Sequence, residues 1–151
     1  MPVNDAFSGR TYPPTAVYEV GREHIRSFAE ALAAGGPVHP AHVDATAAQA
    51  LGYPDVIAPP TMAVIVAHAA NEQYTSDPES GIDYSRVVHG EQKFTHHRPI
   101  VAGDRLVTTL TVDSIRGAGG HAMITMRSEI AAESGEPVCT AIGTIVVRGG
   151  D

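Results

Sequence analysis

The stretch PPTMAVIVAHAA, residues 59–70, decides the fold of this chain. Proline is favoured at the first position of a helix, because the N–H that it lacks would be unpaired there. The residues that follow are apolar on every side of such a helix, which predicts burial all round, with His68 as a core residue. A small domain buries one helix completely only if a sheet wraps around it.

The sequence before this helix predicts an arm, a short strand and two further helices. Residues 1–15 are rich in Pro, Gly and Thr and predict an extended arm, and residues 16–20 predict a strand. Apolar residues recur at helical spacing over residues 22–34, which indicates an amphipathic helix. Asp44 is a candidate N-cap for a short helix over residues 45–51, because its carboxylate can accept the first backbone N–H groups.

The second half of the chain predicts the sheet. Residues 93–99, 106–116, 121–131 and 138–148 are rich in Val, Ile and Thr, and much of their length alternates polar with apolar residues. Short links join these segments, so we expect an antiparallel meander. Because the predicted helices precede most of the predicted strands in the sequence, the chain is expected to form an α+β domain. One domain is expected to span residues 1–151.

Composition narrows the class of protein. The formal net charge is −7, which argues against a nucleic-acid partner because phosphate binding requires a basic face. The N-terminus carries no signal-peptide pattern, and the apolar run over residues 62–70 is about half as long as a bilayer crossing needs. We therefore expect a cytoplasmic protein with no membrane contact. The single cysteine, Cys139, excludes an internal disulfide and is expected to be a buried small hydrophobe.

Four motifs follow one another along the chain. They are residues 7–14 (FSGRTYPP), 18–23 (YEVGRE), 42–58 (HVDATAAQALGYPDVIA) and 90–104 (GEQKFTHHRPIVAGD). Together they resemble the MaoC-like (3R)-hydroxyacyl-thioester dehydratases, and the first two are similar to the HadA and HadC subunits of that group. The resemblance implies a hot-dog fold, in which a curved antiparallel sheet wraps around a long central helix.

The resemblance also implies a reaction and the residues that perform it. Family members interconvert a (3R)-3-hydroxyacyl thioester and a trans-2-enoyl thioester, which requires a base, an acid and a donor to the thioester oxygen. Their Asp and His stand in the pattern G-D-x-N-P-x-H, where this chain reads GPVHPAH over residues 36–42. Pro37 occupies the Asp position, so His42, with His39 as a substitute for the missing carboxylate, is the catalytic candidate.

Substrate binding is expected at the entry to the central helix. In the family, a backbone N–H at the start of this helix donates to the thioester oxygen, but Pro60 has no N–H to donate. By the resemblance, the expected substrate-binding residues are Ile57, Ala58, Pro59, Pro60 and Thr61. No cofactor is expected. No metal site is expected either, since His96 and His97 are adjacent on a strand and point to opposite faces.

Four functions remain open at this stage. The first is a substrate-binding dehydratase subunit in fatty-acid or polyketide chain elongation, which depends on a MaoC-type catalytic partner. The others are a self-sufficient hydratase or dehydratase that uses His42, a thioesterase, and a non-catalytic acyl-thioester-binding protein. The expected ligand is an acyl thioester of coenzyme A or of an acyl carrier protein, and Lys93, Arg98 and Arg105 could form a basic docking patch. We expect a heterodimer with the partner, or a homodimer.

Overall fold

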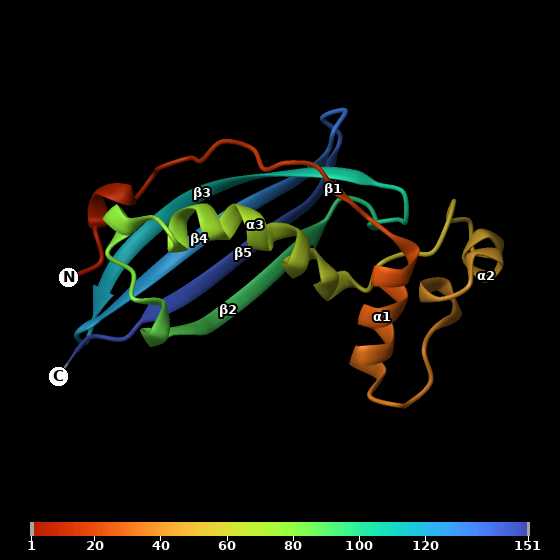
Figure 1. Ribbon diagram of the computed structural model, residues 1–151, viewed down its shortest axis with the longest axis horizontal. Coiled ribbons are helices and arrows are strands. Elements are labelled where there is room, and N and C mark those ends of the chain that lie inside the picture. The colour runs from red at the N-terminus through yellow and green to blue at the C-terminus, as the bar shows by residue number, and fades with distance from the viewer. Residues whose placement is uncertain (1, 151) are drawn as a thin grey trace.

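The computed structural model describes residues 2–150, so Met1 and Asp151 lie outside the described part. Figure 1 shows a helix, α3 (Ala63–Thr75), lying across one face of a long antiparallel sheet. One 3-10 turn, η3 (Pro60–Met62), precedes this helix and begins at the second proline of the pair. The two chain ends lie at one end of the molecule, and helices α1 (Arg22–Ala33) and α2 (Ala45–Ala50) lie at the other.

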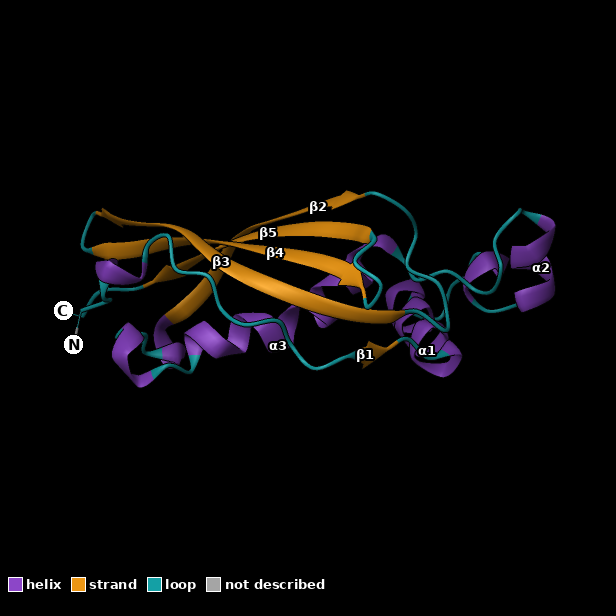
Figure 2. Ribbon diagram, turned by 90° about the horizontal axis from the view of Figure 1, so that it is seen from above, coloured by secondary structure: helices purple, strands orange, loops and turns teal. Residues whose placement is uncertain are grey.

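The sheet contains five strands in the order β1-β3-β4-β5-β2, and each neighbouring pair is antiparallel. Their bounds are β1 (Tyr18–Glu19), β2 (Val87–His96), β3 (Arg105–Ala118), β4 (His121–Ala132) and β5 (Pro137–Val147). On β3 and β4 alternate residues are buried beneath α3, as expected for strands with one face on a core. Figure 2 shows the curvature of this sheet over the helix.

The predicted meander is wrong at its first strand. Strand β2 begins earlier than predicted and pairs with β5 at the edge of the sheet, instead of lying beside β3. Residues 97–104 connect β2 to β3, which lies three strands away. Three strand spacings amount to about 14 Å, whereas a link of this length can extend to about 28 Å, so short connections do not force neighbouring strands to pair.

The prediction that the central helix is buried all round is also wrong. Its buried residues face the sheet on one side: Ala63, Val66, Ala67, Ala70 and Tyr74. Val64 is 38% exposed on the other side. His68 is exposed as well and lies 3.3 Å from Glu72, so it is not a core residue. The sheet of this chain covers only one side of the helix.

The two outer edges of the sheet differ. The N-terminal arm, which contains the 3-10 turn η1 (Asp5–Phe7), runs beside β3. The Gly9 and Tyr12 N–H groups donate to β3 carbonyls at 2.7 and 2.8 Å, so the arm pairs with this edge. Strand β2 forms the opposite edge, and no described strand pairs with its outer side. An open ten-residue edge of this kind is a template for pairing with another chain.

The core is built of apolar side chains in two clusters, one at each end of α3. Cys139 is fully buried in the cluster nearer to α1, as predicted. Burial raises the pKa of its thiol to about 11, which keeps it protonated and unreactive at neutral pH. No helix among residues 2–150 combines the length and the apolar character needed to cross a membrane.

Two short helical segments and the turns around them extend beyond the end of the sheet. Helix α1 (Arg22–Ala33) has Ala34 as its C-cap, and a turn leads from there into the segment 37–58, which we call the overhang. The overhang contains the 3-10 turn η2 (Pro40–His42) and helix α2 (Ala45–Ala50). Figures 1 and 2 both show α2 at the far end of the molecule. The Asp44 side chain accepts the N–H groups of the first turn of α2, which confirms it as the N-cap.

The chain between α3 and β2 contains two further 3-10 turns, η4 (Pro78–Ser80) and η5 (Tyr84–Arg86). Both begin after an aspartate whose side chain accepts a backbone N–H, so each turn has an N-cap. These turns lead the chain from the end of α3 back to the outer edge of the sheet.

Candidate functional site

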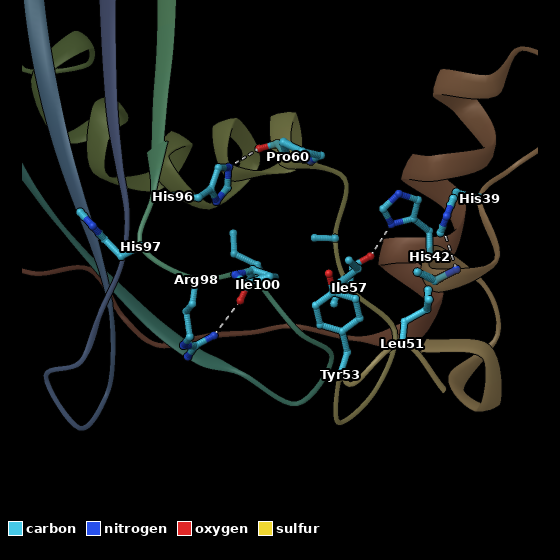
Figure 3. Close-up of a pocket in the computed structure, with 13 residues that line it drawn as sticks. His39, His42, Leu51, Tyr53, Ile57, Pro60, His96, His97, Arg98 and Ile100 are labelled. Atoms are coloured by element: carbon cyan, nitrogen blue, oxygen red, sulfur yellow. Dashed lines mark hydrogen bonds between the residues drawn. The ribbon is translucent and has the colours of Figure 1, made fainter. Parts of the chain in front are cut away.

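A cleft of about 740 Å³ lies where the overhang, the start of α3 and the link after β2 meet. Figure 3 shows its lining side chains, which come from both sides of the chain segment leading into α3. The lining residues are His39, Ala41, His42, Leu51, Tyr53, Ile57, Ala58, Pro60, His96, His97, Arg98, Pro99 and Ile100. The lining combines apolar side chains with four histidines and one arginine.

Two arginines of α1 hold the overhang in place. The Arg22 guanidinium donates to both carboxylate oxygens of Asp55, from Nε to Oδ1 at 3.0 Å and from Nη2 to Oδ2 at 2.7 Å. These hydrogen bonds hold the pKa of the Asp55 carboxyl below its usual value. Arg26 Nε donates to the Val43 carbonyl at 2.9 Å, one residue after His42. The position of the cleft wall therefore depends on α1.

His42 is fixed by one hydrogen bond from its ring. Its Nδ1 lies 2.6 Å from the carbonyl oxygen of Ile57, and a carbonyl can only accept, so Nδ1 carries the proton. The Ile57 N–H in turn donates to the Ala41 carbonyl at 3.0 Å, which ties this segment to η2. In the neutral ring Nε2 then has a free lone pair, so it can accept a proton.

His39 has the opposite arrangement. It is the N-cap of η2, and its Nδ1 accepts the Ala41 N–H at 3.2 Å. The proton of the neutral His39 ring therefore lies on Nε2. The two rings lie edge to face with their centroids 5.9 Å apart. His39 is exposed and His42 is half-buried, so the pair presents one proton donor and one proton acceptor at the side of the cleft.

The predicted substrate-binding stretch is only partly in the cleft. Ile57, Ala58 and Pro60 line it, whereas Pro59 is buried and Thr61 is exposed, and neither is part of the lining. The Ala58 N–H donates to the Ile100 carbonyl at 2.8 Å, so this backbone donor is already used. Pro59 and Pro60 have no N–H, and the first backbone donor of the helix entry belongs to Thr61.

Sequence reasoning missed the wall that the link after β2 provides. His96, His97 and residues 98–100 line the cleft opposite the overhang. His96 Nε2 donates to the Pro60 carbonyl at 3.0 Å and so ties the end of β2 to the helix entry. His97 bonds to the Thr140 hydroxyl at 3.2 Å. The motif RPIVAGD marked this segment, but only its contact with residues 57–60 places it in the cleft.

The three cations considered for a docking patch are paired with carboxylates. Arg98 donates to both Asp104 oxygens at 2.8 and 3.0 Å and to Glu136 at 3.1 Å. Arg105 pairs with two glutamates on the neighbouring chain segments, and Lys93 lies 3.1 Å from Glu91. The predicted patch is therefore wrong, because each of its cations has a carboxylate beside it. Among residues 2–150, no group of three or more His, Cys, Asp or Glu side chains is arranged to hold a metal ion.

Comparison with known proteins gives relatives over nearly the whole chain. A UPF0336 protein of Saccharopolyspora erythraea is 56% identical over 149 residues, which are 99% of this chain and 94% of the relative. A UPF0336 protein of Streptomyces griseus is 50% identical over 148 residues, 98% of this chain and 97% of the relative.

Two solved structures share both fold and sequence with this chain. A MaoC-like dehydratase is 37% identical with a TM-score of 0.87, and the match covers 97% of this chain but only 44% of that one. The C-terminally truncated HadBC (3R-hydroxyacyl-ACP dehydratase) complex from Mycobacterium tuberculosis is 30% identical with a TM-score of 0.81, covering 93% of this chain and 96% of that one.

The helix in its curled sheet and the cleft at the helix entry define a MaoC-like hot-dog domain, as the sequence motifs predicted. Residues 6–141 match the family described as FAS1-like, dehydratase domain region. This chain belongs to that family.

Proposed function

We propose that this chain is a substrate-binding subunit of a (3R)-3-hydroxyacyl-thioester dehydratase, working in the cytoplasm in fatty-acid or polyketide chain elongation with a MaoC-type partner. The observation that carries the proposal is the lining of the cleft, in which no described residue is Asp or Glu. Pro37 stands where the family has its catalytic Asp, and Pro60 removes a backbone donor.

Two further observations support a partner. The outer edge of β2 and one side of α3 are uncovered in this chain. The HadBC dehydratase, which is similar to this chain over almost its full length, is a complex of two kinds of subunit. A catalytic Asp and His from a MaoC-type partner would supply the carboxylate that this cleft lacks, together with the partner's own histidine.

Activity measurements with and without a partner test this proposal. The chain is expressed alone and together with a MaoC-type protein of the same organism, and hydration of crotonyl-CoA is followed. We expect activity only in the pair. Replacing the partner's Asp or His should abolish that activity, whereas His42→Ala should retain most of it. The exposed His68→Ala serves as the matched control, because His68 lies outside the cleft.

A second candidate is a self-sufficient hydratase, which the hydrogen bonds of the two histidines favour. His42 Nε2 would take the proton from the carbon next to the thioester carbonyl, and His39 Nε2–H would protonate the departing hydroxide to give water. Activity of the chain alone that is lost in His42→Ala but kept in His68→Ala would replace the first proposal with this one. Binding of acyl thioesters without turnover in either sample would indicate a non-catalytic binding protein, and release of free thiol would indicate a thioesterase.

A further inference from the structure

A second, smaller cleft of about 430 Å³ adjoins the first one. Three residues, Tyr53, Arg98 and Pro99, line both clefts, so they form the boundary between the two. Figure 3 shows the Tyr53 ring pointing into the first cleft beside Ile57. The ring is therefore one part of the wall between the two spaces.

The backbone at Tyr53 is held by hydrogen bonds, whereas its side chain is not. The Tyr53 N–H donates to the Ala48 carbonyl at 3.1 Å, and Gln49 Nε2 donates to the Pro54 carbonyl at 3.2 Å. Gly52 turns the chain between α2 and Tyr53 with a φ of +93°, a backbone conformation that favours glycine. The Tyr53 hydroxyl makes no hydrogen bond to any other described residue. The ring is therefore positioned by its backbone and by packing, and its hydroxyl is not required to hold it.

The second cleft suits an apolar chain. Pro54, Val101 and Ala102 contribute apolar surface to its lining. Its three charged residues are paired with one another, because Arg98 is bonded to both Asp104 and Glu136. An acyl chain in this cleft would therefore meet no unpaired charge among the described residues.

The other direction out of the first cleft is closed. Met62 and Ala63, at the entry to α3, are 0% exposed, and Val66 is 3% exposed. All three belong to the core cluster that also contains strand residues of the sheet, so side chains already occupy the space beneath the helix. The second cleft, on the far side of Tyr53, is the neighbouring space into which an acyl chain from the histidines could extend.

We propose that Tyr53 is the residue that limits acyl-chain length at this site, with its ring as the partition between a head cleft and a tail cleft. The inference rests on the proposed function, since it takes the ligand to be an acyl thioester. Each buried methylene group strengthens binding about fourfold. Affinity should therefore rise with chain length until the chain reaches Tyr53, and then level off.

Binding of saturated acyl-CoA esters from C4 to C16, which cannot be hydrated, tests this inference by calorimetry. The full chain is measured alone and co-purified with its partner. We expect the chain length at which affinity levels off to increase in Tyr53→Ala and decrease in Tyr53→Trp. Tyr53→Phe should leave it unchanged, and so should Tyr84→Ala, whose ring is 58% exposed on η5 and lines neither cleft.

The outcomes separate this inference from the proposed function. A variant is taken as folded if its melting temperature equals that of the wild type. If acyl-CoA binds and the levelling-off length is the same in folded Tyr53→Ala and Tyr53→Trp, the role of Tyr53 is overturned and the proposed function stands. If neither the chain nor its complex binds any ester of the series, the proposed function fails and the length limit fails with it.

Discussion

At the scale of the residue, Tyr74 has an unusual environment. It is fully buried under the N-terminal arm, where its ring lies 5.7 Å from that of Phe7, and its hydroxyl has no hydrogen-bond partner among the described residues. Burial raises the pKa of this phenol to about 12, so it stays neutral. An unpaired buried hydroxyl costs about 1–3 kcal/mol, whereas the ring itself contributes packing.

We therefore expect Tyr74→Phe to raise the free energy of unfolding by about 1 kcal/mol, because it removes the hydroxyl and keeps the ring. Tyr74→Ala should lower it by about 3–5 kcal/mol, because it leaves a cavity. Urea denaturation measures both values. A clear loss of stability in Tyr74→Phe would show that the hydroxyl is paired in solution.

At the scale of the element, the attachment of the overhang to α1 depends on the charge of Asp55. Its pKa is lowered by the hydrogen bonds from Arg22, so the ion pair stabilises the folded state above the unfolded carboxyl pKa of about 3.9. This contribution is lost as pH falls through the lower, folded-state pKa. The stability of the overhang should therefore decrease in acid.

We expect Asp55→Asn to lower the melting temperature at pH 7, and the difference from the wild type to narrow steadily as pH falls below the unfolded carboxyl pKa of about 3.9. Thermal unfolding followed across this pH range measures the effect. Glu30→Gln on α1, the helix that carries Arg22, is the control, because Glu30 is exposed and has no ion pair within residues 2–150. A difference between Asp55→Asn and the wild type that persists unchanged at pH 3 would contradict this account.

At the scale of the whole molecule, the uncovered edge of β2 is the expected contact with a partner chain. Val88 is 44% exposed on this strand. Lysine on an edge strand opposes pairing with another sheet at little cost to folding. We expect Val88→Lys to weaken association with the partner, or with a second copy, at least tenfold. Light scattering and co-purification measure this association.

Met123→Lys provides the matched control for that experiment. Met123 is 41% exposed, but it lies on β4, which has a neighbouring strand on each side. The Met123→Lys substitution should leave association with the partner unchanged. If the wild type, Val88→Lys and Met123→Lys associate equally well, the contact lies elsewhere, for example on the exposed side of α3.

Much of the fold could be predicted because its signals are local. The helix after Pro60, the N-cap at Asp44 and the alternation within β3 and β4 depend on residues close together in the chain. The same holds for the burial of Cys139 in an apolar run. For the site, the motif at residues 36–42 indicated which histidines to consider and showed that the usual Asp is missing.

The sequence by itself thus determined the α+β class, the central helix, the family motifs and the proline at position 37, where the motif has Asp. Only the tertiary structure decided that β2 pairs with β5, that α3 has an open side, and that His96 and Tyr53 face the same cleft as His42. The physical reason is the range of the interactions. Helix and strand periodicity act between near neighbours, whereas strand order, hydrogen-bond partners and cleft walls depend on distances between segments far apart in the chain.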